Sequence, residues 1–448
     1  MDNMGLLTKI KSFKGGIHPP EEKQITENLT FEIMPDPKTA VLPLSQHIGK
    51  PSKPVVEKGT EVITGDLIAD ADGFISAPVL SPVTGKVLKI ANNSTLSGFP
   101  KECVFISSSE NGEVKRFLPL NPGTVTSEEI RTRIKEAGIV GQGGAAFPTF
   151  VKLSPPAGKK IEYLILNGCE CEPYLTRDYR FMIERSSDII EGLKLSMKAA
   201  GAGAGIIGIE DNKPEAIRVM TEAVKNEKDI RVEVVKTKYP QGAEKMLIKA
   251  VTGREVPPGQ LPLEVGVVIQ NIGTAIEIYE AVAEGNPPVF ASLTVSGKGI
   301  KTPKNLMVKI GTPLIDVIEY CGGLTEDAVK VVIGGPMMGV GQYDFSAPVM
   351  KATSGILALT AGEVKLHPET ACLRCGRCVE VCPLNLLPTR LARLSQLEKL
   401  EDAEAFGINT CMECGSCVYE CPANIPLVQW IRIGKKGLFK LKQQKKTA

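Results

Sequence analysis

Two cysteine-rich runs near the end of the sequence constrain the fold most. They read ACLRCGRCVEVCP and TCMECGSCVYECP, and each has the spacing C-x2-C-x2-C-x3-C-P. This spacing is typical of [4Fe-4S] clusters, in which three closely spaced thiolates bind three corners of one cube. Where two such runs occur together, the fourth cysteine, followed by proline, binds the other cluster.

The spacing therefore predicts two cross-ligated clusters. The first cluster would be bound by Cys372, Cys375, Cys378 and Cys421. The second cluster would be bound by Cys411, Cys414, Cys417 and Cys382. Structural zinc and disulfides are the alternatives, but zinc sites usually combine two distant C-x2-C pairs without a third cysteine three residues on. Two complete copies of the run favour iron–sulfur clusters.

Composition narrows the setting of these clusters. The chain has 448 residues, too many for one core, so we expect roughly three or four domains. The net charge of +2 does not favour a nucleic-acid partner. Cluster cysteines must stay reduced, which predicts a cytosolic location. The N-terminus lacks the apolar core of a signal peptide, and no apolar run approaches the ~20 residues of a membrane span. We therefore expect any membrane association to be peripheral.

The N-terminal third is predicted to be an arm over residues 1–28 followed by an all-β domain over 29–109. The latter has short Val/Ile-rich runs separated by Gly, Pro and Asp. It resembles the biotinyl/lipoyl barrel-sandwich hybrid. No MKM-like triplet marks a modified lysine, so a structural or docking role is favoured over a carrier role.

The central residues 120–290 alternate helical and strand patterns, which predicts a Rossmann-like α/β domain. Thr126 and Glu129 are spaced as a capping box for a helix that ends near Ala137. A strand is expected to end at Asn167 and a helix to span 188–200. A G-x-G-x-x-G match at 203–208 leads into a strand and not a helix, so it does not fit a dinucleotide loop.

The C-terminal third is predicted to hold a β-grasp unit over 291–345 and an α-helical two-cluster ferredoxin domain over 361–430. Between the cysteine runs, leucines recur at helical spacing. The basic tail, residues 431–448, is interpreted as solvated and disordered. The alternative is attraction to an anionic bilayer or an acidic partner.

The loop GQGGAAFPTFVK resembles the loop GRGGAGFPTG-x-K of the flavoprotein, NADH-oxidising subunit of complex I and its hydrogenase relatives. NGCECEP resembles that family's N-x-D-E-x-E-P, and an SLBB-like β-grasp unit follows in both. The resemblance covers about 120 to 340. It implies FMN as cofactor, NAD(H) as substrate and a set of cofactor-binding residues: Gly141, Gly143, Gly144, Lys152, Asn167, Glu170, Glu172, Glu244, Gln270 and Asn271.

The resemblance also assigns roles within this set. The glycines let the backbone approach a phosphate or flavin face closely, and Lys152 supplies a charge to the flavin. The amides would bind the flavin, and the three glutamates would bind the nicotinamide nucleotide. Cys169 and Ala243 stand where the family has acids. Cys169 and Cys171 are interpreted as two partly buried thiols, with metal binding or thiol chemistry as the alternative.

The whole domain order, with the opening phrase FKGGIHP, is similar to the C-subunit family of Rnf complexes, the ion-pumping membrane ferredoxin:NAD+ oxidoreductases. This implies an enzyme subunit that passes electrons between two [4Fe-4S] clusters, FMN and NAD(H). Its partners would be other subunits, with ferredoxin reached indirectly, at the cytoplasmic face of the cell membrane. No catalytic side chain is predicted. The alternatives are a cluster conduit and docking scaffold without its own flavin, or a diaphorase subunit of a soluble hydrogenase or formate dehydrogenase.

Overall fold

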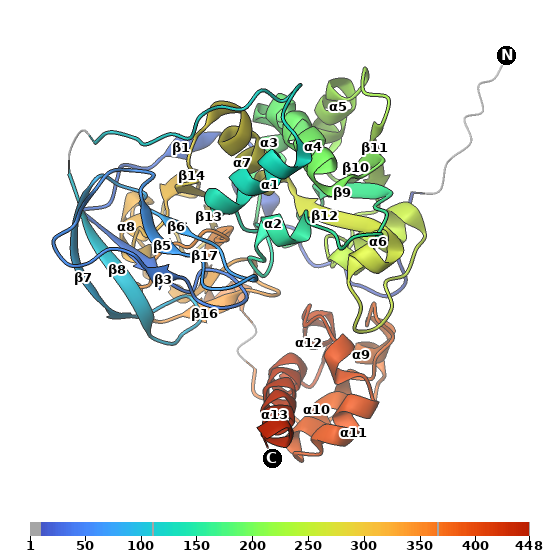
Figure 1. Cartoon of the computed structure of the whole chain (residues 1–448). Coiled ribbons are helices and arrows are strands. Elements are labelled where there is room, and N and C mark those ends of the chain that lie inside the picture. Colours follow the sequence, from blue (N-terminus) through green and yellow to red (C-terminus); the bar gives the residue numbers. More distant parts are fainter. Residues whose placement is uncertain (1–9, 110–111, 365–366, 448) are drawn as a thin grey trace.

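The computed structural model describes residues 10–109, 112–364 and 367–447, which fold into successive domains (Figure 1). The first, the barrel domain, is built of antiparallel strands in two sheets with the orders β2-β8-β7-β4 and β3-β5-β6. In β7, buried Gly85 and Val87 alternate with exposed Lys86 and Leu88, as expected of a strand with one face in a core. The strands are β2 Thr39–Pro43, β3 Lys53–Pro54, β4 Glu61–Val62, β5 Leu67–Asp70, β6 Val79–Leu80, β7 Gly85–Asn93 and β8 Lys101–Ser108.

The second unit, the α/β domain, has a parallel sheet with the order β11-β10-β9-β12. α6 packs on one face, while α1, α4, α5 and α7 share the core of the other face, so the domain has three layers. Its strands are β9 Tyr163–Asn167, β10 Ala204–Glu210, β11 Ile230–Val235 and β12 Val267–Asn271. Its helices are α1 Ser127–Glu136, α2 Thr149–Lys152, α3 Arg177–Glu184, α4 Ser186–Ala200, α5 Pro214–Ala223, α6 Glu244–Thr252 and α7 Ile272–Tyr279.

Local signals explain several of these elements. Thr126 and Glu129 form the expected capping box at the start of α1, because each side chain accepts a hydrogen bond from the other residue's backbone. Pro214 opens α5, where its missing N–H costs nothing. Gly205 and Gly208 lie inside β10, in agreement with the prediction that the G-x-G-x-x-G match is not a dinucleotide loop.

The third unit, the β-grasp domain, has a mixed sheet with the order β1-β14-β13-β17-β15-β16 beside α8. β1 lies in the range expected for the barrel domain, yet it pairs in parallel with β14. The barrel and β-grasp domains share one hydrophobic core, in which Leu42 and Val104 pack with Leu293 and Leu306. The elements are β1 Phe31–Ile33, β13 Phe290–Ser296, β14 Lys304–Lys309, α8 Leu314–Tyr320, β15 Ala328–Ile333, β16 Val340–Gln342 and β17 Gly355–Thr360.

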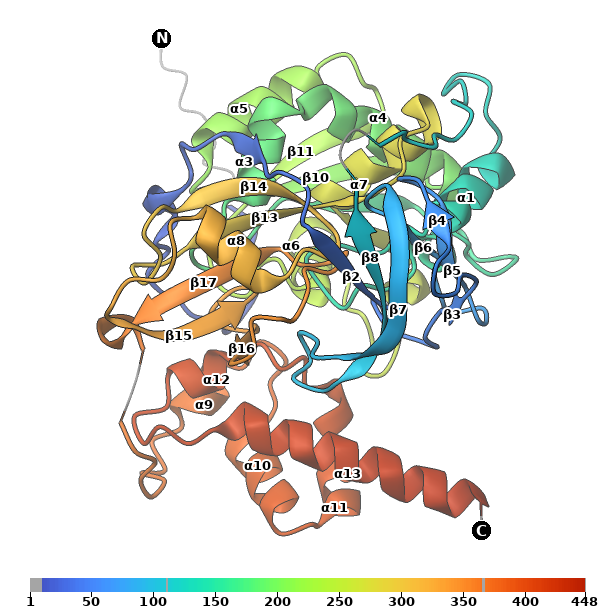
Figure 2. The same ribbon diagram turned by 90° about the vertical axis from the view of Figure 1, so that its left-hand side faces the viewer.

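The fourth unit, the C-terminal domain, is helical and carries both cysteine runs. It lies to one side of the other domains, with α9 and α12 nearest to them (Figures 1 and 2). Its helices are α9 Arg377–Glu380, α10 Pro388–Gln396, α11 Leu400–Ala405, α12 Ser416–Tyr419 and α13 Leu427–Thr447. Short helical turns elsewhere are η1 Lys23–Ile25, η2 Pro262–Val265, η3 Glu280–Glu284, η4 Ala361–Glu363 and η5 Ile408–Thr410.

The prediction of a disordered tail is wrong for the described part of residues 431–448. These residues continue α13 as far as Thr447. Ile431 and Leu438 are buried in a cluster with residues of α10 and α11. Lys442 and Lys445 contact Glu404 and Glu401 of α11. Tertiary packing of one apolar face, which the basic composition obscured, therefore stabilises the helix.

Candidate nucleotide site and cysteine domain

The candidate nucleotide site lies where parallel strands of the α/β sheet end. Asn167 is the last residue of β9 and Asn271 the last of β12, and the two are direct neighbours in register. The Asn167 side-chain amide donates a hydrogen bond of 2.7 Å to the carbonyl of Gly242, which precedes α6. Ligands of open α/β sheets bind at this carboxyl edge. The structure thus brings three sequence-predicted segments together at one edge.

The glycine-rich loop between α1 and α2 closes over this edge. A hydrogen bond of 2.8 Å from the N–H of Gly141 to the carbonyl of Phe147 shapes the loop. Gly143 has a φ of +69°, and a Cβ there would lie 3.2 Å from the side-chain nitrogen of Asn271. A Cβ at Gly144 would meet no atom of the described residues within 4 Å. The protein itself therefore leaves room beside Gly144, as a backbone that approaches a flat ligand requires.

Lys152 and Glu244, which the resemblance gave to different ligands, form an ion pair with each other. Lys152 ends α2 and Glu244 begins α6. Both side chains are partly exposed. The pair places one cation and one carboxylate at the rim of the carboxyl edge.

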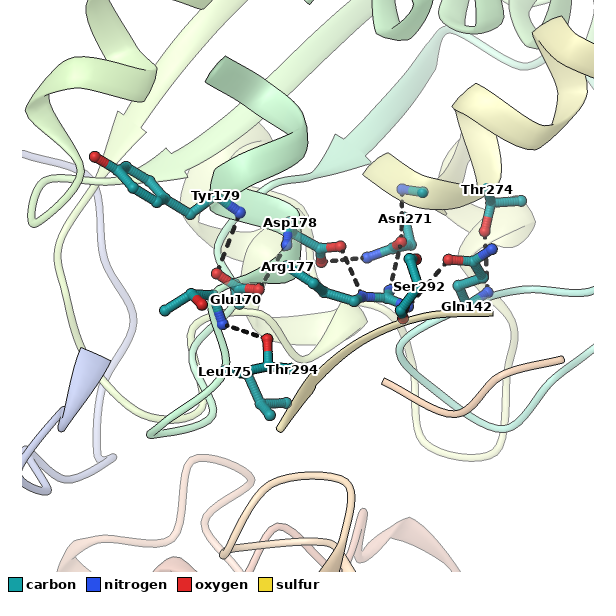
Figure 3. A network of polar contacts seen from close by, with 12 residues as sticks. Gln142, Glu170, Leu175, Arg177, Asp178, Tyr179, Asn271, Thr274, Ser292 and Thr294 are labelled. Atoms are coloured by element: carbon teal, nitrogen blue, oxygen red, sulfur yellow. Dashed lines mark hydrogen bonds and ion pairs between the residues drawn. The ribbon is translucent and has the colours of Figure 1, made fainter. Parts of the chain in front are cut away.

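A buried network centred on Arg177 fixes the floor of the site (Figure 3). The Arg177 side chain is almost wholly enclosed. Its guanidinium donates to Gln142 at 3.0 Å, to Asn271 at 3.1 Å and to Asp178 at 3.1 Å. It also donates to the backbone carbonyl of Ser292 in the β-grasp domain at 3.1 Å. Because the planar guanidinium group reaches several acceptors at once, Arg177 fixes the relative positions of the glycine-rich loop, β12 and the β-grasp domain.

Asn271 is held from both sides of this network. Its amide donates to Asp178 at 2.6 Å, and its oxygen accepts from the N–H of Gly273 at 2.8 Å, which caps α7. Gln142 in the glycine-rich loop donates its backbone N–H to Thr274 of α7 at 2.9 Å. The loop and the helix N-terminus are therefore joined directly.

Glu170 and Glu172 are used structurally. Glu170 accepts hydrogen bonds from the N–H groups of Asp178 and Tyr179 at the start of α3, at 2.7 and 3.2 Å. Glu172 accepts from the N–H groups of Met337 and Met338 in the β-grasp domain, both at 3.0 Å. Burial raises the pKa of each carboxyl to about 7. Glu172 thus faces a β-grasp loop, and Glu170 reaches the site through Asp178.

Two glutamines beside the site carry buried polar atoms that have no partner among the described residues. These atoms are Nε2 of Gln270, in β12, and both amide atoms of Gln241, which precedes Gly242. Buried polar atoms are nearly always hydrogen-bonded in native proteins, so each exception needs a reason. A bound polar molecule is one such reason.

Cys169 and Cys171 flank the same turn. Cys169 is fully buried and Cys171 partly buried. A Cβ at Gly242 would lie 3.1 Å from the Cys171 sulfur. Burial raises the pKa of both thiols, with Glu210 adding to the rise. The interpretation of two partly buried thiols fits Cys171, whereas Cys169 is buried more completely than expected.

The cysteine runs lie side by side in the C-terminal domain. Cys382 of the first run lines a cavity with Cys411, Cys414 and Cys417 of the second run. Burial raises the pKa of the Cys417 thiol, and the adjacent thiols of these three residues raise it further. The predicted ligand set of the second cluster is therefore gathered around one cavity.

Two of the four predicted ligands of the first cluster lie at the surface, and the other two are buried. Burial raises the pKa of the Cys378 thiol, and neighbouring Cys421 and Cys375 contribute to that rise. Cys372 and Cys375 are exposed. Within the described residues, no three His, Cys, Asp or Glu side chains surround one point closely enough for a single metal ion.

The second run also touches the nucleotide side of the molecule. The Tyr239 hydroxyl donates to the carbonyl of Cys414 at 2.6 Å. Tyr239 lies three residues before Gly242, which contacts Asn167 at the sheet edge. The segment 239–242 therefore runs from the cysteine cavity to the candidate nucleotide site.

Comparisons with known proteins cover most of the chain. Residues 134–280 match the Nuo51 FMN-binding domain, 11–111 the RnfC barrel sandwich hybrid domain, 292–341 the SLBB domain and 364–422 the 4Fe-4S dicluster domain. The C subunit of the proton-translocating ferredoxin:NAD(+) oxidoreductase complex of Clostridium ljungdahlii is 47% identical over 88% of this chain and 87% of its own length. The Na(+)-translocating counterpart of Acetobacterium woodii is 43% identical over 88% of this chain and 89% of its own.

The chain belongs to the RnfC family, the C subunits of ion-translocating ferredoxin:NAD+ oxidoreductases. The expected domain types are confirmed with it. No helix in residues 10–109, 112–364 or 367–447 is long and apolar enough to cross a membrane.

Sequence reasoning missed several residues of this RnfC-family site. Arg177 and Asp178 directly follow the CECEPYLT segment, but neither carries a motif of its own. Gln142 lies inside the glycine-rich loop, where the complex I pattern has arginine. The available signal was a charged pair at the start of α3, directly after the segment that contains the NGCECEP motif. Its partners are 35 to 115 residues away, so spacing alone did not identify them.

Proposed function

We propose that this chain passes electrons between two [4Fe-4S] clusters, FMN and NAD(H), as the C subunit of a membrane-bound ferredoxin:NAD+ oxidoreductase. One observation carries the proposal: Tyr239 contacts the cysteine cavity at Cys414, and Gly242, three residues later, contacts the nucleotide edge. A redox path needs these two sites to be adjacent, and the three-residue separation of the two contacts supports such a path.

The residues at the sheet edge fit FMN. Gly143 and Gly144 let backbone come close to a flat ring or a phosphate. Gln270 and Gln241 have amide atoms without a partner among the described residues. Asn167 and Asn271 are neighbours at this edge, and their side chains already bond within the protein, so they would position the site around the flavin. Lys152 would supply the positive charge for the flavin phosphate. When bound, FMN exchanges pairs of electrons with nicotinamide and single electrons with clusters.

The remaining acidic residues divide into two roles in this proposal. Glu244, at the rim beside Lys152, is the candidate for the nicotinamide nucleotide. Glu170 and Glu172 act as positioning residues, because their carboxylates already accept backbone hydrogen bonds. Arg177 is likewise a positioning residue, since it acts through Asn271 and Gln142.

In the C-terminal domain we propose the cross-ligated pairing. Cys372, Cys375, Cys378 and Cys421 would bind one cluster, and Cys411, Cys414, Cys417 and Cys382 the other. The proximity of Cys382 to the second run and of Cys421 to Cys378 supports this pairing. The second cluster would be the one nearer to the flavin.

The proposed location is the cytoplasmic face of the membrane, where the chain would be held by other subunits and reach ferredoxin through them. This follows from membership of a membrane-complex family and from the lack of a spanning helix in the described residues. A carbonate wash of membranes should release the chain, whereas retention would contradict peripheral attachment.

The test of function is cofactor content and NADH reduction of the anaerobically purified chain. We expect about eight irons and one FMN per chain, and bleaching of the flavin absorbance on addition of NADH. If the protein holds its clusters but takes up no flavin during incubation with FMN, the flavin role is wrong. The alternative of a cluster conduit and docking scaffold without its own flavin would then be favoured. Tightly bound zinc in place of iron would overturn the cluster assignment.

A further inference from the structure

The two cysteine runs are structural repeats, offset by 39 residues. Arg374 and Glu413, at equivalent positions, have φ angles of 54° and 61°, and each N–H donates to the sulfur of the preceding cysteine at 3.4 Å. Gly376 and Gly415 follow with φ of 79° and 83°, just before α9 and α12. The backbone around both proposed clusters is therefore nearly the same.

The second repeat is covered by the rest of the chain. Met412 packs against Tyr239, Met337 and Ile17 in one cluster of apolar residues. A Cβ at Gly415 would lie 2.9 Å from the carbonyl of Met337. The carbonyl of Cys414 accepts the hydroxyl of Tyr239. These contacts show how a protein surface sits on a face of this shape.

The same face of the first repeat is open. Leu373, equivalent to Met412, is 67% exposed. A Cβ at Gly376 would meet no atom of the described chain within 4 Å. Cys375, equivalent to Cys414, is also exposed. Leu373 and Gly376 therefore lie at the surface, whereas the equivalent Met412 and Gly415 of the second repeat are covered by other parts of the chain.

The charges on the two faces differ. In the second repeat, Glu413 forms ion pairs with Arg432 at 2.8 Å and Lys435 at 2.6 Å. In the first repeat, the equivalent of Glu413 is Arg374, and that of Ser416 is Arg377; both arginines are exposed. The segment 371–379 contains these two arginines and no acidic residue, while the exposed Glu369 and Glu380 lie just outside it. A proposed cube would add negative charge beneath this basic rim. Because Arg374 and Arg377 have no acidic neighbour within this segment, carboxylates on a partner surface would pair with them.

We propose that Leu373, Arg374, Gly376 and Arg377 form the docking face for an acidic, electron-carrying surface of a neighbouring subunit of the complex. The proposal rests on the proposed function, because a cluster bound by the first run gives the contact its purpose. The partner would seat an apolar group on Leu373, bring backbone against Gly376 and pair carboxylates with the arginines. The intramolecular contact of the second repeat is the template.

The test measures binding of the purified chain to membrane vesicles that hold the other subunits of the complex and lack this chain. Arg374→Glu with Arg377→Glu should weaken this binding at least tenfold and reduce its salt dependence, because charge reversal replaces attraction by repulsion. The matched control is Lys53→Glu with Lys58→Glu, the same charge change on exposed residues of the barrel domain. Vesicles without the complex report nonspecific attachment.

A second pair of variants tests the apolar contact. Leu373→Asp should also weaken binding, whereas Phe99→Asp, at a comparably exposed apolar residue, should not. Iron content and NADH-dependent flavin bleaching are measured on every variant. Undiminished binding of an iron-replete Arg374/Arg377 variant would overturn the docking face while leaving the proposed function intact. Normal vesicle binding with lost affinity for soluble ferredoxin would overturn the assignment to a neighbouring subunit. Wild-type protein without clusters would instead overturn the proposed function.

Discussion

At the residue scale, Arg177 shows how a buried charge can be accommodated by exact pairing. Its guanidinium has acceptors on the glycine-rich loop, β12, α3 and the β-grasp domain. Removing one member of such a set leaves the others buried without partners, which costs more than the set contributes as a whole. The residue therefore controls the shape of the site without touching the reacting groups.

We expect Arg177→Met to destabilise the fold by about 3–5 kcal/mol, because Asp178 would stay buried beside unpaired amides. Chemical denaturation followed by circular dichroism measures this. Arg177→Lys should recover only part of the loss, since an ammonium group lacks the planar fork. The exposed Arg218→Met provides the comparison and should leave the unfolding midpoint unchanged. Equal effects at both sites would contradict the role given to Arg177.

Gly144 gives a second residue-scale prediction. Because a Cβ there meets no described atom, Gly144→Val should fold normally. The added methyl groups should nevertheless occupy the space of the flavin and abolish its binding, with iron content unchanged. Gly362→Val is the matched control, since Gly362 is also exposed and has the same open surroundings among described residues. Flavin absorbance per chain decides the matter, and full occupancy in Gly144→Val would remove this loop from the site.

At the element scale, α7 and the segment before β17 are joined by an ionisable pair, in which Lys351 is buried and Glu277 is half-buried. The Lys351 ammonium donates to the carbonyls of Pro78 at 2.6 Å and Gly138 at 2.7 Å, so it links the β-grasp, barrel and α/β domains. Glu277 on α7 lies close enough to influence it. Burial raises the pKa of Glu277 to about 8 and lowers the pKa of Lys351 to about 8. Burial therefore brings the pKa of each group close to neutral pH.

This enclosure predicts a pH-dependent stability. The folded pKa of Glu277 is above its ordinary value of 4.5, so folding favours the protonated form. Its contribution is complete below pH 4.5 and is lost as the pH rises to about 8. Glu277→Gln should remove this loss and be more stable than the wild type at pH 8, by about 2–4 kcal/mol.

The measurement is the difference in Tm between Glu277→Gln and the wild type from pH 5 to pH 8. We expect this difference to grow in favour of the variant as the pH rises. The exposed Glu326→Gln supplies the baseline. A difference that stays constant across this range would show that Glu277 keeps an ordinary pKa in the fold.

Elements whose signals are local could be predicted from the sequence. The capping box of α1, the C-terminal end of α4 and the strand that ends at Asn167 were predicted, because caps and periodicity depend on neighbouring residues. The helical structure of the tail in α13 could not be predicted, because the residues that pack against it lie on α10 and α11. The pairing of β1 with β14 was not predicted for the same reason, because a strand's own residues do not specify which strand it pairs with.

The candidate site divides in the same way. Glycine and cysteine spacings identified the loop and the cysteine runs, because close approach and cluster ligation each demand particular residues at particular intervals. Glu172 accepts a hydrogen bond from Met337 of the β-grasp domain, and Lys152 of α2 pairs with Glu244 of α6. Both contacts depend on how elements far apart in the sequence pack together. No sequence interval records that packing.

At the scale of the whole molecule, the proposed electron path crosses the joint between the C-terminal domain and the α/β domain, where Tyr239 contacts Cys414. Tyr239→Phe should loosen this joint by about 1 kcal/mol, the typical net value of one hydrogen bond, and slow reduction of the clusters by NADH several-fold. Stopped-flow absorbance separates flavin reduction, which should be unchanged, from cluster bleaching. Tyr343→Phe, at an exposed tyrosine, should behave as wild type. Unaltered cluster bleaching in an iron-replete Tyr239→Phe protein would show that this contact is not part of the path.

The segment from Lys11 to Ile17 has a consequence for how the protein is made. Lys11 pairs with Val235, Ile17 pairs with Tyr239, and the N–H of Gly16 donates to the carbonyl of Val381 at 2.8 Å. On the ribosome, this segment emerges more than three hundred residues before Val381. Its pairing with Val235 and Tyr239 can therefore form before its hydrogen bond to Val381, which requires the C-terminal domain to be synthesised. Closure of this joint is thus a late step of folding, which follows the pairing of the N-terminal segment with the α/β domain.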